Sequence, residues 1–302
     1  MKKKSVPVFF VVAIIIISIV VLVVGNIIDK RTPSKKHASE EDIYKLYRLY
    51  DGYTEDGDKI SFEGATKAAD NQVAILLQNE IVSDRAFIDN GELYVDYEFV
   101  KNSLNNRFYW DNNENILIYT TPTDIVKAGV GSQEYYVTKA KKTAEYTIVK
   151  AEGSKVYVAL DFVKNYSNIE YTLYDSPNRV CITNEWGVEE NISTLKKDTK
   201  IRLDKSIKSD ILYNCKSATE VVVLDKGKTW SEVITEDGFF GYVKTDSLRK
   251  QTTKTLQNDY VEPEYTNIQK DFTINMAWHM VTAQASNNQL MDLVTPAKGL
   301  NV

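Results

Sequence analysis

A long uncharged apolar run opens the pattern of hydrophobic and polar positions along this chain. It extends from Val6 to Ile28 and follows the lysines Lys2 to Lys4. At a rise of about 1.5 Å per residue, a helix of this length spans a hydrocarbon core of about 30 Å. No small-residue cleavage site follows the run, as a cleaved signal peptide would require. The pattern therefore predicts a signal-anchor transmembrane segment over residues 1–30.

Beyond this run, apolar residues recur in short alternating stretches, and the clearest of them runs from Thr229 to Lys244. Two strand-like segments rich in β-branched and aromatic residues flank Asp237-Gly238, a pair that suits a tight two-residue turn. This stretch predicts a β-hairpin. Three further short apolar runs lie upstream, at 201–203, 211–212 and 221–224. Their spacing suits a compact five-stranded barrel.

Strand alternation assigns the residues of this hairpin to two faces. Val233 and Val243 fall on one face and are predicted to point into a small core, whereas Trp230 and Tyr242 fall on the other. Together with Phe240, these two aromatic residues are the candidate ligand-binding residues of the chain. The alternative is that they are ordinary half-buried aromatic residues of a small barrel.

A short helix is predicted after the polar segment that contains Pro33. Ser39 suits the N-cap position, and Asp42 lies three residues on. Large side chains recur at helical spacing on one face of this helix: Ile43, Leu46, Tyr47 and Tyr50. We expect that face to pack against the next domain.

The middle of the chain contains an internal repeat. Residues 91–102 and 153–165 both end in Phe-Val-Lys-Asn, and each copy continues into two strand-like runs joined by turn-forming residues. Each unit predicts a strand, a short helix and a hairpin, so the two copies are expected to pair into one α+β core. Acidic residues stand where the first turn of a helix favours them, and we assign them no catalytic role: Asp96, Glu98 and Asp161.

Charge and composition narrow the classes of partner and cofactor. The net charge is -5, and no basic stripe lies outside the flanks of the apolar run, so nucleic acid is not expected as a partner. Cys181 and Cys215 lie in different predicted domains, which predicts buried thiols rather than a disulfide framework. His37 and His279 lie near no cysteine or carboxylate cluster at ligand spacing, so no metal site and no cofactor are predicted.

The stretch 197–250 resembles the bacterial SH3-like domain family. The likeness is carried by the order of its short apolar runs, by Trp230-x-x-Val233, and by the Gly-Tyr-Val sequence that ends at Val243. The loop from Lys205 to Asp210 departs from the family pattern. The resemblance implies a small all-β barrel that binds cell-wall peptide through Trp230 and Tyr242, or that acts as a spacer.

The repeat, within 72–190, resembles the domain family named after the N-terminal domain of copper amine oxidases. Tyr94-Val95, Phe99-Val100 and Trp110-Asp111 carry the likeness. The family name implies no copper chemistry. Its bacterial members are surface modules without catalytic residues of their own, and the resemblance implies the same for this chain.

The end of the chain, residues 271–302, resembles the opening of family 18 glycoside hydrolases, through 274–279 and 298–302. That family is a (β/α)8 barrel, which needs about 200 residues or more. Its Asp-x-x-Asp-x-Asp-x-Glu motif, which supplies the catalytic acid, occurs nowhere in this sequence. We therefore assign no catalytic residue and expect the chain to be inactive alone, with Asp271 and Asp292 as solvated surface charges.

Taken together, these patterns predict a multidomain chain. Its expected parts are a transmembrane segment (1–30), a linker with a short helix (31–71), an α+β domain (72–190), an SH3-like barrel (197–250), a linker (251–270) and the truncated first unit of a (β/α)8 barrel (271–302). The predicted location is the cell membrane, with a single pass and the C-terminal bulk extracytoplasmic.

Three functions stay open at this point. The chain is the non-catalytic front of a family 18 glycosidase-like protein acting on cell-envelope glycans, a surface module that binds peptidoglycan, or a passive stalk. The first of these is the expectation that follows from the order of the resemblances. Its predicted partners are the membrane and peptidoglycan or another cell-envelope glycan.

Overall fold

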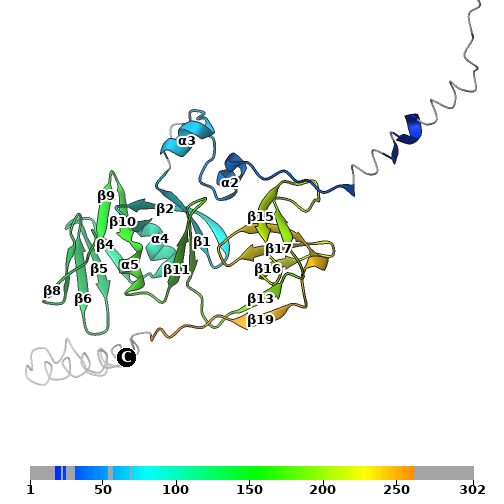
Figure 1. Cartoon of the computed structure of the whole chain (residues 1–302). Coiled ribbons are helices and arrows are strands. Elements are labelled where there is room, and N and C mark those ends of the chain that lie inside the picture. The colour runs from blue at the N-terminus through cyan, green and yellow to red at the C-terminus, as the bar shows by residue number, and fades with distance from the viewer. Residues whose placement is uncertain (1–17, 22, 25–30, 54–56, 69, 262–302) are drawn as a thin grey trace, which may run out of the picture. The chain divides into compact units, whose positions relative to one another are not determined.

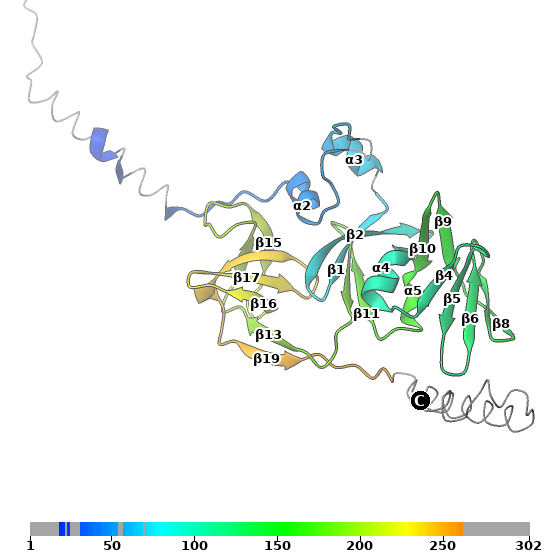
Figure 2. The same cartoon turned by 180° about the vertical axis from the view of Figure 1, so that it is seen from behind.

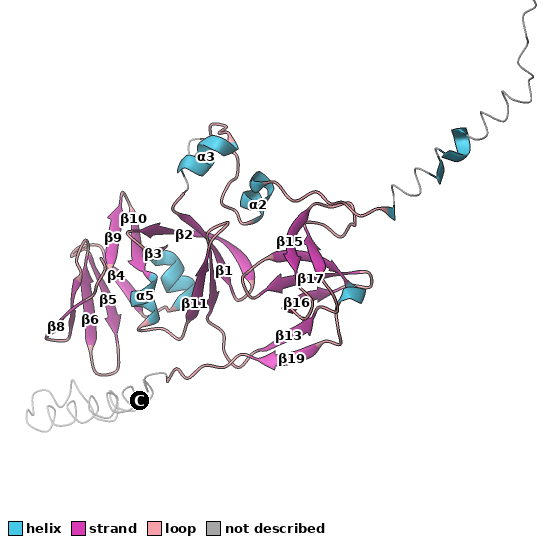
Figure 3. Cartoon of the chain, in the orientation of Figure 1, coloured by secondary structure: helices cyan, strands magenta, loops and turns pink. Residues whose placement is uncertain are grey.

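The computed structural model describes residues 18–21, 23–24, 31–53, 57–68 and 70–261 (Figure 1). Most of the regular structure in these residues is β-strand, and the helices are short (Figure 3). The strands form three sheets.

The order of strands in each sheet follows from their hydrogen-bonded neighbours. The first sheet has the order β11 (Glu170–Tyr174), β12 (Arg179–Thr183), β1 (Gln72–Leu77), β2 (Glu80–Asp89), β3 (Glu92–Asp96), β10 (Lys155–Ala159) and β9 (Val149–Glu152). The second has the order β15 (Ile211–Cys215), β14 (Thr199–Arg202), β18 (Phe240–Lys244), β17 (Trp230–Thr235), β16 (Glu220–Lys226), β13 (Glu189–Thr194) and β19 (Thr252–Thr255). The third has the order β4 (Phe108–Asp111), β5 (Ile116–Thr120), β6 (Ile125–Gly129), β7 (Glu134–Val137) and β8 (Ala140–Thr143). The helical elements are α2 (Glu40–Leu46), α3 (Phe62–Ala68), α4 (Tyr97–Phe99), α5 (Leu160–Lys164), the π-helical turn η1 (Val100–Leu104) and the 3-10 turn η2 (Thr245–Ser247).

The predicted membrane anchor is corrected by the structure. Among the residues it describes, no helix is long and apolar enough to cross a membrane. The single-pass anchor, and the cell-membrane localisation that rested on it, are therefore not supported. That prediction used only the length and hydropathy of Val6 to Ile28, most of which lies outside the described residues. Neither property establishes that a continuous helix forms there.

The fold class is also corrected at the other end of the chain. The described part consists mainly of β-strands in three sheets, and no (β/α)8 barrel is present in it. The predicted first barrel unit, 271–302, lies outside the described residues. A strand-helix-strand pattern of this length cannot form such a barrel without the remaining units.

The chain divides into two compact units, which we describe separately. The first comprises residues 1–85 and 171–257, and the second comprises 86–170 and 258–302. The predicted domain ranges stay predictions.

In the second unit, the two copies of the repeat pair through their strands. β3 and β10 are antiparallel, with Val95 opposite Val158, and both side chains are fully buried. Short helical turns follow both strands, as predicted, and bury Phe99 and Phe162. The two hairpins, however, join different sheets: β4 and β5 belong to the third sheet, and β11 and β12 to the first. The expected single core is wrong in this respect, because β5 continues into a meander of three more strands.

In the first unit, the second sheet encloses a small apolar core. Its buried members come from most of the strands of that sheet: Leu195, Ile201, Leu212, Cys215, Val221, Val223, Val233, Val243 and Leu248. Val233 and Val243 are fully buried, which confirms the predicted inner face of the hairpin. β19, in the stretch predicted to be a linker, lies alongside β13 in both views (Figure 2).

A second apolar cluster in this unit joins α2 and β1 to the outer face of β17. It contains Tyr47, Leu49, Ala74, Leu76 and Ile234. The helix begins with the predicted capping box, since the Ser39 side chain accepts from the Asp42 amide and the Asp42 carboxylate accepts from the Ser39 amide. The prediction that its apolar face packs against neighbouring structure is confirmed.

Candidate ligand-binding site

The structure brings the three candidate aromatic residues to one face of the β17–β18 hairpin. Trp230 lies opposite Lys244, Glu232 opposite Tyr242, and Ile234 opposite Phe240. Side chains directly opposite each other in an antiparallel pair share a face. We call this surface the β17–β18 face; its three aromatic side chains are half-buried.

One end of the β17–β18 face opens into a hollow of about 470 Å³. Residues from α2, the β1–β2 turn and the second sheet line it: Leu46, Arg48, Asn79, Glu80, Ile81, Leu224, Glu232 and Phe240. Phe240 also packs against the cluster around Tyr47 and Leu76. This ring is therefore partly committed to packing and partly exposed to the hollow.

The middle of the face carries Tyr242 between groups of opposite charge. Its hydroxyl donates to Glu232 Oε1 over 3.3 Å. The Lys205 ammonium lies 5.1 Å from the ring centroid and 3.7 Å from the Asp225 carboxylate. Burial raises the pKa of Tyr242, and the neighbouring Glu232 carboxylate adds to this effect. Tyr242 is therefore a neutral hydrogen-bonding aromatic residue near neutral pH.

The far end of the face carries Trp230. The Lys244 ammonium lies 5.8 Å from its ring centroid. Nearer the hollow, an irregularity in β16 between Val223 and Asp225 shifts its register against β17, and Leu224 is left 39% exposed. Together these residues provide an aromatic surface bordered by cations, carboxylates and one exposed aliphatic side chain.

This arrangement suits binding rather than bond cleavage. Aromatic faces stack on planar or ring groups, and the flanking charges fix the position of a polar ligand. Within residues 31–53, 57–68 and 70–261, no group of three or more His, Cys, Asp or Glu side chains is placed to hold a metal ion. No catalytic role follows from the geometry of this face.

The loop of the hairpin, in contrast, packs against β12 and the end of α2. The predicted two-residue turn is wrong, because the loop between β17 and β18 has four residues, 236–239. Its Gly238 is buried, and the backbone oxygen of that residue accepts from the Tyr47 hydroxyl over 2.7 Å. Arg179, only 2% exposed, donates from Nε to the Asp237 carbonyl over 2.6 Å. Packing against β12 therefore holds the backbone of Asp237 and Gly238 in place, whereas the Glu236 side chain stays exposed.

Both cysteines lie in the first unit and are free. Burial raises the pKa of Cys181 to about 11 and that of Cys215 to about 12. At neutral pH both are protonated thiols, which are poor nucleophiles.

Sequence reasoning missed the polar side chains around the aromatic residues. Lys205 lies in the loop that departs from the SH3-like pattern, so that departure was a usable signal. Arg48 and Asn79 have positive φ values of 57° and 68°, and no local pattern predicted that the turns which hold them meet at one hollow. Their position depends on tertiary packing.

Comparison with known proteins supports one of the three resemblances. Residues 76–182 match a family model described as the copper amine oxidase N-terminal domain. That domain is therefore found in this chain, over the stretch that contains the repeat. A search of curated proteins found no match.

The structure of NlpC1 from Trichomonas vaginalis is one of the solved structures that match. It is 11% identical, with a TM-score of 0.19, over 48% of this chain and 44% of that one. The chain thus spans less than half the length of that protein. A likeness at this TM-score carries no argument about function.

The other two resemblances are corrected. The comparisons give no support for an SH3-like domain or for a family 18 glycoside hydrolase. Short apolar runs closed by Gly-Tyr-Val are compatible with other small β-sheets, and the residues that suggested the glycosidase lie outside the described part of the chain.

Proposed function

We propose that this chain is a non-catalytic binding module whose β17–β18 face holds a peptide of the cell wall. The observation that carries the proposal is the alignment of Trp230, Tyr242 and Phe240 along one face, beside the hollow of about 470 Å³. All three rings are half-buried, so each keeps a part of its surface that a ligand can contact.

The charges around this face favour a peptide with groups of both signs. Lys205 lies beside the Tyr242 ring and Lys244 beside the Trp230 ring, whereas Glu80, Glu232 and Arg48 line the hollow. A ligand carboxylate can meet the Lys205 ammonium near the tyrosine or Arg48 in the hollow, and a ligand ammonium can meet Glu80 and Glu232 there. Peptides of the cell wall that carry free carboxylates and amines belong to this class.

Titration of the full chain with soluble peptidoglycan fragments tests the proposal. Binding is read from tryptophan fluorescence, and Trp230→Phe identifies the part of the signal that comes from the face, since the chain has four tryptophans. Trp230→Ala and Tyr242→Ala should each weaken binding by about 10-fold, the effect of losing about 1.4 kcal/mol at an aromatic contact.

Tyr109→Ala is the matched control, because this tyrosine is 57% exposed and lies on β4, in the third sheet. It should bind as the parent does. Equal binding by all the variants, or no binding by the parent, contradicts the proposal. The second of these results favours a passive spacer.

The assignment to the front of a family 18 glycosidase plays no part in this proposal. It rested on residues 271–302, which lie outside the described part of the chain.

A further inference from the structure

The edge of the second sheet is covered by the chain's own N-terminal segment. β15 is the outermost strand on that side of the sheet. Along it lies the segment Ser34–Ala38, which forms a parallel bridge to Ile211 through His37. The Ile211 amide donates to the Lys36 carbonyl over 2.9 Å, and the Ala38 amide donates to the Ile211 carbonyl over 2.8 Å. We call this surface of Ile211 and the preceding loop the β15 edge.

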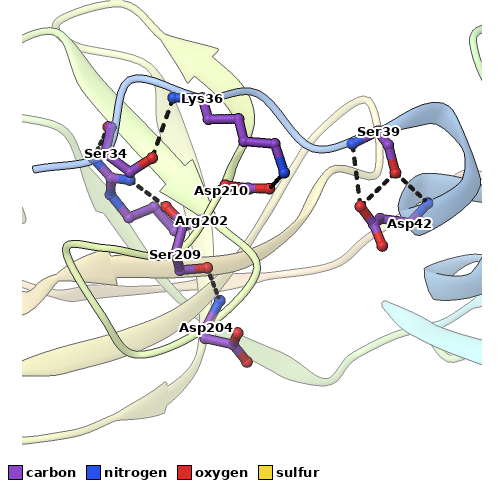
Figure 4. A network of polar contacts seen from close by, with 8 residues as sticks. All are labelled: Ser34, Lys36, Ser39, Asp42, Arg202, Asp204, Ser209 and Asp210. Atoms are coloured by element: carbon purple, nitrogen blue, oxygen red, sulfur yellow. Dashed lines mark hydrogen bonds and ion pairs between the residues drawn. The ribbon is translucent and has the colours of Figure 1, made fainter.

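Side chains of the second sheet also contact this segment (Figure 4). The Lys36 ammonium lies 2.7 Å from the Asp210 carboxylate. Arg202, only 5% exposed, donates from Nη2 to the Ser34 carbonyl over 3.1 Å. The Ser34 amide donates to the Ile207 carbonyl over 2.8 Å. The segment is thus recognised through its main chain and through one cationic side chain.

These contacts have the form of strand addition to a sheet edge. An edge strand offers unpaired N–H and C=O groups to any extended chain, and side-chain contacts then give selectivity. Here the buried guanidinium of Arg202 is held by the protein and aimed at a main-chain carbonyl. Asp210, with a side chain only 21% exposed, marks the position that takes a cation.

The segment is also held weakly enough to be exchanged. The Lys36 side chain is 72% exposed, so its ion pair with Asp210 is screened by salt. Residues 35–37 are all exposed. Short exposed segments with few buried apolar contacts open locally at low cost in free energy.

We propose that the β15 edge is a binding site for an extended peptide that carries a lysine side chain, and that Ser34–Ala38 occupies this site within the same chain. The incoming peptide places a carbonyl on Arg202 Nη2 and, two residues later, a lysine on Asp210. The chain's own segment therefore regulates access to the site. This inference rests on residues outside the β17–β18 face and goes beyond the function proposed for that face.

The test uses the full chain, in which two substitutions weaken the contacts of Ser34–Ala38 with the β15 edge. Lys36→Glu faces Asp210 with a like charge, and Ala38→Pro removes the amide that donates to Ile211. A fluorescently labelled peptide with the sequence of residues 31–39 is then titrated by anisotropy. It should bind the double variant at least 10-fold more tightly than it binds the parent chain.

A charge exchange tests the selectivity of the site. The same peptide with glutamate at the position of Lys36 should bind the double variant at least 10-fold more weakly. Adding Asp210→Lys to the double variant should reverse that preference. Tyr109→Ala, which lies outside both sites, should leave peptide binding unchanged. The residues tested at the β15 edge are not those tested on the β17–β18 face, so the two proposals fail independently.

Amide hydrogen exchange in the parent chain needs no substitution. Saturating peptide should speed exchange of the Ala38 amide, which loses its acceptor, but not of the Ile211 amide, which receives a carbonyl from the peptide. Equal acceleration of both amides, no binding to the double variant, or binding that is insensitive to the charge exchange overturns the proposal. The proposal is also overturned if the double variant dimerises and the peptide does not dissociate the dimer. In that case a second copy of the chain occupies the site.

Discussion

A single glycine fixes the joint between the hairpin loop and β12 in the first unit. Gly238 has a φ of 79°, and a Cβ added there would lie 2.8 Å from Cys181 Sγ and 3.1 Å from Leu76 Cδ2. The positive φ disfavours any residue with a side chain, and the two close atoms leave no space for a Cβ. The sequence predicts a tight two-residue turn here because Asp-Gly is typical of such turns, whereas the structure requires the same glycine for close packing in a longer loop.

Gly238→Ala should lower the free energy of unfolding by about 1–3 kcal/mol more than the matched variant Gly91→Ala. Gly91 has a similar φ of 85°, but nothing lies within 4 Å of its added Cβ. The Gly91→Ala control therefore has the cost of a side chain at positive φ but not the steric clash of its Cβ with neighbouring atoms. Urea denaturation of both variants measures the difference, and equal losses contradict the packing account.

Glu92 provides a pH-dependent contribution to stability in the second unit. Burial, with a smaller effect from the Asp161 carboxylate, raises the pKa of Glu92 to about 7. Its Oε1 is buried without a hydrogen-bond partner. The folded state thus binds a proton more tightly than the unfolded state, whose pKa is near 4.5. Between these two values stability falls as pH rises, because the folded carboxyl must ionise in a poorly solvated place.

Glu92→Gln should be more stable than the parent at pH 8, and the difference should shrink as the pH is lowered to 5, where the parent carboxyl is protonated when folded. Thermal unfolding of parent and variant at both pH values measures this. Burial raises the pKa values of the neighbouring Tyr94 and Tyr146, so both phenols stay protonated at pH 5 and at pH 8. A pH-independent difference would contradict the assignment to Glu92.

At the scale of single elements, sequence patterns predicted correctly those helices and strands that depend on interactions between residues close together in the chain. The paired strands of the β17–β18 hairpin, though not its turn, the strand and short helix of each repeat copy, and the capping box at Ser39 are present as predicted. Each rests on residues a few positions apart. The pairing of β19 with β13 and of Ser34–Ala38 with the β15 edge was not predicted. Both are main-chain pairings between distant segments with polar sequences, for which hydrophobic alternation gives no signal.

The capping box of α2 allows a test at this scale. Ser39→Ala should cost about 1 kcal/mol of stability, because the Asp42 amide loses its acceptor at 3.1 Å. Ile43 and Leu46 of this helix pack against both apolar clusters of the unit. Fraying of α2 therefore also weakens the packing of these clusters. Ser39→Thr keeps a capping hydroxyl and should be close to the parent in chemical denaturation. Equal losses in the two variants would exclude the cap as the cause.

At the scale of the whole molecule, the sequence predicted its middle better than its ends. The resemblance carried by Tyr94, Phe99 and Trp110 falls inside the matched domain, residues 76–182. The predicted anchor and glycosidase unit depended on composition and short motifs at the two ends, which lie largely outside the described residues. Hydropathy and brief motifs do not determine which tertiary contacts a segment makes.

Within the first unit, the two strands at the ends of the matched domain pair with each other. β1 and β12 pair in parallel, from Ala74 opposite Arg179 to Leu77 opposite Ile182. Arg179 of β12, together with Tyr47 at the end of α2, holds the loop of the second sheet's hairpin. The strands that begin and end the matched domain and the sheet that carries the β17–β18 face therefore share one compact unit.

Calorimetric titration of the full chain with peptidoglycan fragments tests the binding account most directly. It compares the double variant Trp230→Ala, Tyr242→Ala with Tyr109→Ala, Tyr136→Ala, whose tyrosines are 57% and 48% exposed elsewhere in the chain. The account predicts that the first double variant loses at least 10-fold in affinity and that the second binds as the parent does. Equal affinities of the two double variants would contradict it.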